Sequence, residues 1–257
     1  MRKNLCFIAI LLTCACSVKE NRSECPCELV VRSEEVLKTE GSVLVSVIQE
    51  DAVVKQGMMS REDFEAGRCR LTVPRKPSTV TVFSGITDMN ILNGRWLDIR
   101  FEHQCDELYS CSEFAPIDGE IYDCVVTAHK NFVRLYLTII GMPEGAEAEV
   151  RGSVQGYDII DHTPFQGSFA CTPVFDEKGA GYCVRLPRQT DDDLTLDIIQ
   201  PGKTTRQIAI GDMISASGYR YDDPDLLDIS ITVDLSKSNV VVTVADWTIE
   251  GYKLIEY

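Results

Sequence analysis

The chain has 257 residues, 44% of them hydrophobic and 25% charged, as in ordinary globular proteins rather than disordered or fibrous ones. It carries 25 Lys and Arg residues against 40 Asp and Glu, which gives a net charge of −15. Nucleic-acid binding needs a concentrated basic face that this sequence does not supply, so that function class is excluded. The length accommodates one large β domain or two of about 100 to 130 residues, each able to bury its own core.

The N-terminal residues have the composition of an export signal. A positive segment over residues 1–4 precedes an apolar run over residues 5–12, which is shorter than the ~20 residues that cross a bilayer as a helix. Ala15 then precedes Cys16, a combination that resembles the lipobox of bacterial lipoproteins. The resemblance implies a signal peptide over residues 1–15 and lipid attachment to Cys16; Cys14 is the second choice because it follows a threonine. An ordinary secretory signal is the alternative.

Residues 16–27 are predicted to form a lipidated tether, because those that follow Cys16 are nearly all polar as far as Glu24. Loss of the signal also removes Arg2 and Lys3, so the remaining chain is more acidic still and is repelled by anionic headgroups. Two or three acyl chains, rather than protein charge, would therefore hold the chain at a membrane.

Cysteine usage indicates disulfides. Of the 11 cysteines, two lie in the signal and one is the lipid site, which leaves an even set, as in exported disulfide-bonded proteins. That set is Cys25, Cys27, Cys69, Cys105, Cys111, Cys124, Cys171 and Cys183. Cys171 and Cys183 flank a turn-rich segment at residues 176–181, so a hairpin would bring these two thiols together, and we predict a disulfide between them.

Metal sites find little support in the sequence. Cys25-Pro26-Cys27 suggests a redox dithiol or half of a metal site, but no second close pair of cysteines and no nearby histidine complete a tetrahedral set, which favours separate roles for the two thiols. The acidic clusters at residues 191–193 and 222–225 lack the ligand alternation and central glycine of a calcium loop, which favours solvated turns. We predict no metal and no cofactor.

Alternation of apolar and polar residues predicts β-strands through most of the chain. Residues 97–102, 133–139 and 228–235 alternate with a period of two rather than 3.6. Clusters of Gly, Pro, Asn and Asp separate them from further β-rich runs. Those runs are residues 28–32, 42–49, 70–73, 79–84, 121–127, 182–186, 194–198 and 240–245. Many short strands at this spacing favour an all-β fold built from sandwiches.

One short helix is predicted, over residues 61–66. Ser60 is a suitable N-cap, Asp63 follows three residues later, and Gly67 can end the helix. A polar break at residues 128–131 precedes the long strand that begins at Phe132, so we place a domain boundary there. The two predicted β-sandwich domains are residues 28–128 and residues 129–257.

The order of these features resembles that of the fimbrial anchor subunits of Bacteroidota-type (type V) pili, the fimbrillin-A-associated anchor proteins. The shared features are the lipobox, the segment Arg-Ser-Glu-Cys-Pro-Cys at residues 22–27, the strand at 132–141, and the closing strands with Trp247. The resemblance spans essentially the whole mature chain. It implies two tandem transthyretin-like β-sandwich domains, lipidation in the outer membrane, no enzymatic activity, and a role at the base of a fimbria in tethering it and limiting its growth. The implied protein partner is a stalk subunit (pilin).

Motifs for enzymatic chemistry are absent. The sequence contains no Gly-x-Ser-x-Gly, no His-Glu-x-x-His and no phosphate-binding glycine loop. His103, His129 and His162 lie on distant segments and are predicted to be surface or hydrogen-bonded histidines rather than catalytic bases. We therefore predict no catalytic residue.

The alternative function is a surface glycan-binding lipoprotein, which would share export, lipid anchor and β-sandwiches. Such a protein needs aromatic platforms, and only Trp96 and Trp247 supply indoles. Trp96 is the better candidate because it follows a turn at residues 93–95, although packing in a core is the ordinary use of so large a ring.

The C-terminal residues 246–257 are rich in aromatic and aliphatic side chains that suit strands. In one interpretation they pair as an edge strand of their own domain, since an exposed apolar edge invites aggregation. In the other, which the family resemblance supports, the tail is donated to a groove in the stalk subunit, with Gly251 as the hinge. The donated side chains would be those of Tyr252, Leu254, Ile255 and Tyr257.

Overall fold

The computed structural model describes residues 22–33, 37–176, 181–201, 206–237, 239–244 and 247–253. The lipid site predicted at Cys16 and the tail residues Leu254, Ile255 and Tyr257 lie outside these ranges. No helix of the described part of the chain is long and apolar enough to span a membrane.

Strands make up most of the regular structure. In the first half they are β1 (Pro26–Ser33), β2 (Ser42–Gln49), β3 (Ala52–Ser60), β4 (Arg70–Pro74), β5 (Pro77–Ile86), β6 (Asn90–Asn93), β7 (Trp96–Ile99), β8 (Tyr109–Pro116), β9 (Ile121–Val126) and β10 (His129–Lys130). In the second half they are β11 (Phe132–Ile140), β12 (Glu147–Asp158), β13 (Thr163–Cys171), β14 (Val174–Asp176), β15 (Gly181–Pro187), β16 (Thr195–Ile199), β17 (Arg206–Ala209), β18 (Ile229–Asp234), β19 (Asn239–Val244) and β20 (Trp247–Lys253). The helices are α2 (Arg61–Glu65) and α3 (Ile210–Ala216).

The N-terminal half is a β-sandwich. Sheet A has the strand order β4-β1-β9, and sheet B has the order β10-β8-β5-β2-β3. Alternate residues of both sheets enter one core, such as Leu29 and Val31 from β1 and Val45 and Val82 from β2 and β5, all fully buried. Burial of one face of each sheet follows from the period of two in these strands, as predicted.

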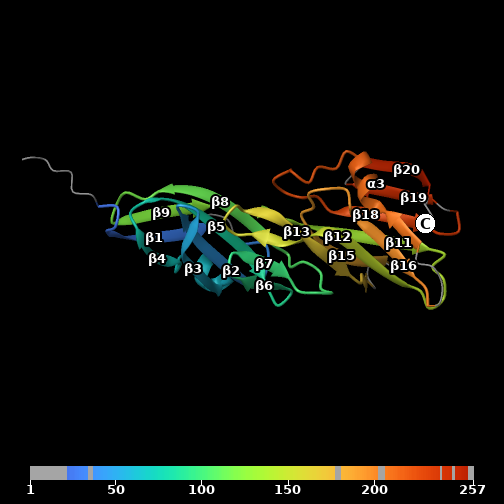
Figure 1. Cartoon of the computed structure of the whole chain (residues 1–257), viewed down its shortest axis with the longest axis horizontal. Helices are drawn as coiled ribbons and strands as arrows, with labels where there is room; N and C mark the ends of the chain where they lie inside the picture. The colour runs from blue at the N-terminus through green and yellow to red at the C-terminus, as the bar shows by residue number, and fades with distance from the viewer. Residues whose placement is uncertain are drawn as a thin grey trace, which may run out of the picture.

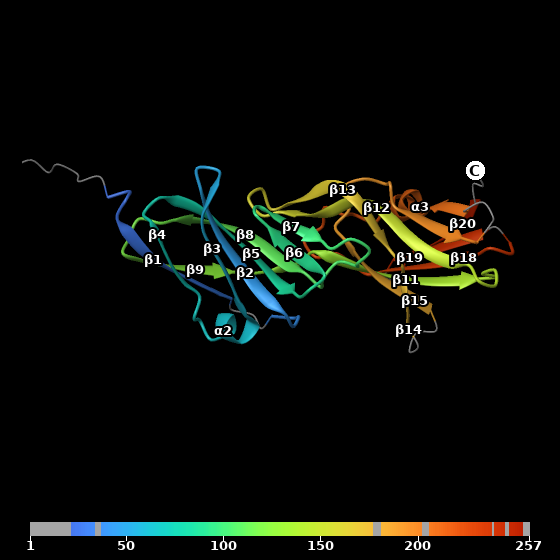
Figure 2. The same ribbon diagram turned by 60° about the horizontal axis from the view of Figure 1, so that its bottom comes forward.

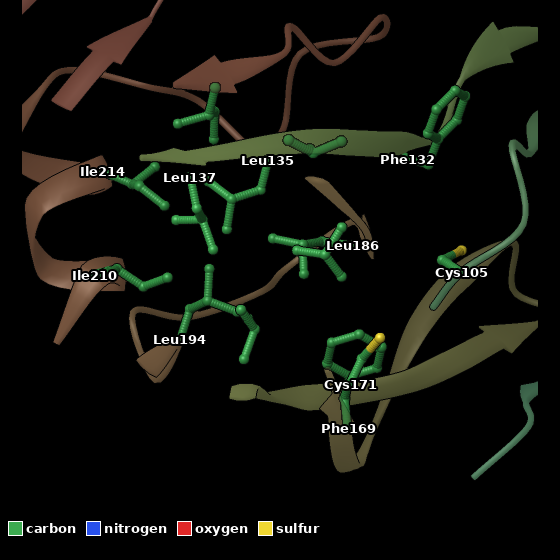
Figure 3. Packing of buried hydrophobic residues seen from close by; sticks show 14 of the residues in the cluster. Cys105, Phe132, Leu135, Leu137, Phe169, Cys171, Leu186, Leu194, Ile210 and Ile214 are labelled. Carbon is green, nitrogen blue, oxygen red and sulfur yellow. The ribbon is translucent and has the colours of Figure 1, made fainter. Parts of the chain in front are cut away.

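The C-terminal half is a second, larger sandwich. Sheet C has the order β17-β16-β12-β7-β6, with β13 also paired to β12, and sheet D has the order β14-β15-β11-β18-β19-β20. Leu135 and Leu137 from sheet D meet Leu194 from the edge of sheet C, and Ile210 and Ile214 of α3 close the core (Figure 3). The all-β sandwich architecture is therefore confirmed.

The two halves share strands and core, so they do not divide cleanly at residue 128. The hairpin β6–β7 precedes the predicted boundary, yet β7 pairs with β12 in sheet C, where Asp98 lies opposite Gly156. A Cβ atom at Gly156 would lie 2.3 Å from the carbonyl oxygen of Leu97, so the close approach of β7 requires glycine there. Conversely, β10 lies after the boundary and pairs with β8 in sheet B.

The predicted helix is confirmed: α2 begins at Arg61, as predicted, and Ser60 is its N-cap. The Ser60 side chain accepts a hydrogen bond of 3.1 Å from the backbone N–H of Asp63, and Gly67, at φ +67°, follows the C-cap residue. The second helix, α3, was not predicted. The alternation predicted a strand as far as residue 102, but β7 ends at Ile99, and Phe101 is 76% exposed in the turn that follows.

The molecule is elongated, with the N-terminal sandwich at one end and the C-terminal sandwich at the other (Figure 1). The described chain enters at the far end of the first sandwich, ahead of β1, whereas β20 lies at the opposite end of the molecule (Figures 1 and 2). The first and last strands of the described chain therefore lie far apart.

Candidate functional site

The chain is firmly attached to the first sandwich where the described residues begin. Arg75 donates its backbone N–H to the Cys25 carbonyl at 3.1 Å and its Nε–H to the Pro26 carbonyl at 3.1 Å. Lys76 Nζ lies 2.7 Å from a Glu24 carboxylate oxygen. The turn between β4 and β5 thus holds the start of β1 at this end of the molecule.

The thiols of the Cys25-Pro26-Cys27 segment have different environments. Cys27 is fully buried in the N-terminal core, opposite Val73 in register, whereas Cys25 is partly exposed. Burial raises the pKa of the Cys27 thiol, against the lowering effect of the Arg75 charge. A buried thiol with a raised pKa is a weak nucleophile, which agrees with the separate roles predicted for the two cysteines.

At the other end, β20 is the last strand in the order of sheet D within the described chain. It pairs antiparallel with β19, with Tyr252 opposite Val240 and Glu250 opposite Val241. Gly251 is therefore the extra residue of a β-bulge. Residues 247–253 thus form the edge strand of their own domain, as in the first interpretation of the tail, and the predicted hinge residue is a break in the ladder.

The segment between Cys171 and Cys183 forms a hairpin, but its register differs from the predicted one. Val174, not Cys171, lies opposite Cys183 in the pairing of β14 with β15. Cys171 ends β13 in sheet C, where it pairs with Val150, and its side chain is in the core (Figure 3). Both cysteines are thiols in the structure. The hairpin geometry used to predict their disulfide is therefore wrong, because residues 172 and 173 carry the chain from one sheet to the other.

The junction between the two sandwiches is organised by Arg188, which the sequence did not single out. Its Nε donates to Asn131 Oδ1 at 2.6 Å, and its Nη atoms donate to the carbonyls of Tyr221, Asp223 (2.8 Å) and Pro224 (3.0 Å). Burial is the largest influence on this guanidinium and lowers its pKa from the ordinary value. Arg188 thus binds the linker between the halves to the loop at residues 221–224.

The three histidines come from different segments, but His129 and His162 line the same hollow, and the buried Nε2 of His162 has no hydrogen-bond partner among the described residues. The ring of His103 bonds to the Phe101 carbonyl, and His129 Nδ1 lies 3.0 Å from Asp225 Oδ2. His162 follows the tip of β12 and packs on Phe83 with ring centroids 5.4 Å apart. Burial, and secondarily the charge of Arg188, lowers its pKa to about 4, so this ring is neutral at pH 7.

A hollow of about 380 Å³ lies beside His162. Its lining comes from both halves and includes Ser110, Ser112, Asn131, His162, Arg188 and Asp222. Among the described residues no cluster of His, Cys, Asp and Glu has the geometry of a metal site.

The acidic clusters make hydrogen bonds that order turns. Asp191 accepts a hydrogen bond of 2.7 Å from the Ser153 hydroxyl, and Asp225 accepts one of 2.7 Å from the backbone N–H of Lys130. Asp222 forms an ion pair with Arg220 at 2.8 Å. These contacts agree with the predicted turn-forming role.

Trp96 is held by its neighbours. The Arg95 guanidinium lies over the Trp96 ring, 4.8 Å from its centroid, and the Phe165 ring packs against it at 4.7 Å. These contacts favour a packing role over a sugar platform. Trp247 begins β20, with its backbone opposite Val244.

Solved structures with a similar fold are described as a fimbrial anchor protein, a polysaccharide-binding protein and an adhesin. The fimbrial anchor protein Mfa2 of Porphyromonas gingivalis aligns with a TM-score of 0.66 and 12% identity over 89% of this chain and 100% of its own. A proposed polysaccharide-binding protein of Bacteroides thetaiotaomicron aligns with a TM-score of 0.65 and 13% identity, over 88% of this chain and 98% of its own. A proposed adhesin of Bacteroides ovatus aligns with a TM-score of 0.58 and 13% identity, over 88% and 96%.

No protein-family model matches the chain, and no curated protein matches it by sequence. At 12 to 13% identity these likenesses establish the fold. The resemblance drawn from the sequence is therefore confirmed at the level of the fold, which the chain shares with a fimbrial anchor over nearly its whole length.

Proposed function

We propose that this chain is an outer-membrane lipoprotein that anchors the base of a fimbria to the cell surface and takes part in fimbrial assembly and length control. The observation that carries the proposal is that β1 and β20, the first and last strands of the described chain, lie at opposite ends of an elongated molecule (Figure 1), on a fold shared with a fimbrial anchor. One end can be fixed to lipid while the other contacts a stalk subunit. The proposed role needs no enzymatic activity.

The membrane end is supported by the sequence ahead of β1. Lipid on Cys16 would be followed by a polar segment that leads to Cys25, which the turn between β4 and β5 holds in place. A pull on the lipid would therefore be transmitted into the first sandwich rather than into a loose tail. The acidic surface requires a hydrophobic anchor, because it is repelled by anionic headgroups.

The partner end is supported by β20. An edge strand offers its outer backbone groups to a further strand, and a bulge at Gly251 weakens the ladder near the C-terminus. The proposal retains donation of the tail from residue 252 onward to the stalk subunit, with main-chain hydrogen bonds as the source of affinity. Residues 247–250 would stay paired with β19.

Replacement of the proposed lipid site tests the membrane end. Cys16→Ala should release the chain and its fimbriae into the medium, whereas Cys14→Ala, two residues away in the same segment, should leave both on the cell. Intact mass spectrometry of the wild-type chain should show a lipid-modified N-terminus. Retention of the Cys16→Ala protein on membranes would refute the lipid anchor.

Truncation after Gly251 tests the partner end. It removes only two of the residues that pair with β19 in the described strand, so the domain should fold and remain lipidated. Fimbriae should then detach into the medium while the anchor stays on the cell. If fimbriae remain attached, donation of this tail is excluded. If the truncated chain does not fold, the tail belongs to its own sandwich.

A further inference from the structure

Two hollows adjoin at the junction of the sandwiches. The hollow of about 380 Å³ described above and a second one of about 490 Å³ are both lined by His162, Arg188 and Asp222. The second hollow extends along the loop at residues 189–192. The two are here called the junction cleft. Each volume lies in the range of ~300–1,000 Å³ that small-molecule sites occupy, and such sites are frequent where two domains meet.

Polar atoms without a hydrogen-bond partner gather beside the second hollow. Seven buried side-chain atoms of the described residues are of this kind, and three of them, His162 Nε2, Gln189 Oε1 and Tyr221 Oη, belong to residues that line it. Gln189 is only 2% exposed, and its Nε2 donates to the Pro187 carbonyl at 2.8 Å. An unpaired buried polar group is unfavourable, so native proteins retain few of them. Three beside one hollow therefore favour a site at which a bound molecule supplies the partners.

The charges that line the junction cleft disfavour charged ligands. Arg188 is the only lining residue with a guanidinium or ammonium group, and it lines both hollows. The lining carboxylates are those of Glu113, Asp191, Asp192, Asp222 and Asp223. These carboxylates would repel an anion, whereas a cation large enough to fill the cleft would also meet Arg188. A neutral ligand avoids both penalties.

A molecule rich in hydroxyl groups fits this mixture of donors and acceptors. Each hydroxyl both donates and accepts, so it can donate to a carboxylate while it accepts from a phenol or a guanidinium. Tyr221 remains a protonated donor at neutral pH, because burial and the negative charges of Asp192 and Asp191 raise the pKa of its phenol. Thr163 and Thr190, both exposed, add hydroxyls of their own to the second hollow.

We propose that the junction cleft binds a neutral saccharide, with His162 and Tyr221 as the groups that recognise its hydroxyls. Because His162 Nε2 and Tyr221 Oη are buried in the wall of the cleft, binding moves exposed lining side chains, such as those of Thr163 and Asp222, aside. The site goes beyond the anchor function and does not depend on it, since neither the N-terminal lipid nor β20 takes part.

Saturation-transfer NMR on the purified protein tests the class of ligand. The probes are the methyl glycosides of glucose, galactose, mannose and N-acetylglucosamine, with glucuronate and glucosamine as charged counterparts. At least one neutral glycoside should receive saturation from the protein, and neither charged sugar should receive more than that glycoside does. Absence of transfer to every neutral glycoside, or stronger transfer to a charged sugar, would overturn the inference.

Two neighbouring tyrosines provide a matched pair of variants. Their rings pack at 4.9 Å, but the Tyr219 hydroxyl donates to the Leu227 carbonyl at 2.8 Å, whereas the Tyr221 hydroxyl has no partner among the described residues. Tyr221→Phe should weaken binding of the neutral glycoside about threefold to tenfold, as expected for the loss of one hydrogen bond, without lowering Tm. Tyr219→Phe should leave the affinity unchanged. Equal affinities of the two variants would contradict the proposed role of Tyr221.

Nitrogen-15 NMR of the imidazoles tests the position of the site. The Nε2 resonance of His162 should shift when the glycoside is added, whereas that of His103, which is exposed and bonded to the Phe101 carbonyl, should not. If the glycoside binds without moving the His162 resonance, or if purified stalk subunit moves it and no glycoside does, the inference is wrong. Release of fimbriae by Cys16→Ala tests the anchor function separately, so either proposal can fail alone.

Discussion

Replacement of Arg188 by methionine should destabilise the junction between the two sandwiches. Methionine keeps the aliphatic part of the side chain but removes the donors to Asn131, Tyr221, Asp223 and Pro224. The carbonyls of Asp223 and Pro224 lie near the surface, where water can replace the guanidinium. Asn131 is only 5% exposed, and the Tyr221 carbonyl faces the same buried group, so these two acceptors are left without a donor.

The magnitude follows from those two acceptors. A hydrogen bond from a charged donor contributes roughly 1.5–3 kcal/mol, so we expect the free energy of unfolding to fall by about 3–6 kcal/mol. For a chain of this size that corresponds to a drop in Tm of roughly 6–24 °C. Hydrogen exchange of residues 219–225 should accelerate in the same variant, because Arg188 holds this loop to the linker.

Arg220→Met is the matched control, because Arg220 lies in the same loop but pairs with Asp222 at the surface, with both side chains more than half exposed. An exposed pair contributes at most ~1 kcal/mol. Urea unfolding of both variants measures how much the Arg188 guanidinium contributes to the stability of the junction, compared with an exposed arginine of the same loop. A loss for Arg188→Met no greater than that for Arg220→Met would show that the junction does not depend on this guanidinium.

Three further changes have defined outcomes. His162 has a folded-state pKa of about 4, below its ordinary 6.5, so the unfolded chain binds more protons than the folded chain between pH 4 and pH 6.5. The free energy of unfolding should therefore fall by roughly 3 kcal/mol as the pH drops from 6.5 to 4. His162→Gln should remove that part of the pH slope in urea unfolding, and an unchanged slope would contradict the assignment. Gly85→Ala should lower the free energy of unfolding by more than ~3 kcal/mol, since φ is +90° and the new Cβ would lie 2.2 Å from a backbone oxygen. Gly67→Ala, with φ +67° and open space around the new Cβ, should lower it by about 1 kcal/mol. Equal Tm values for the two variants would refute this contrast. Ser60→Ala should cost about 1 kcal/mol by loss of the N-cap of α2, and Ser60→Asp should restore it; a silent Ser60→Ala would mean that packing alone holds the helix.

Features with local causes were predictable from the sequence. Helix α2 depends on Ser60 and Gly67, which lie within a few residues of it, and β2 was predicted over its full length because its flanking turns carry clear signals. Strand β12 was missed because register shifts near Gly152 and Gly156 interrupt its alternation. Helix α3 was missed because its N-cap residue, Ala209, supplies no side-chain hydrogen bond.

Features with distant causes were not predictable. Arg188 acts through carbonyls more than 30 residues away along the chain, and no local pattern marks it. The position of Cys171 depends on which sheet its strand joins, which the spacing to Cys183 does not reveal.

The central place of β1 in sheet A determines how the molecule responds to mechanical load. β1 is hydrogen-bonded to β4 on one side and to β9 on the other, and it starts at the end of the molecule where the chain enters (Figure 1). A pull on the chain ahead of Arg22 enters the sandwich at β1, and its component along the strand loads both ladders. The hydrogen bonds of both ladders then share the force at once in shear, whereas a pull across the strands would open them one after another. The entry strand is thus placed to withstand tension rather than to unzip.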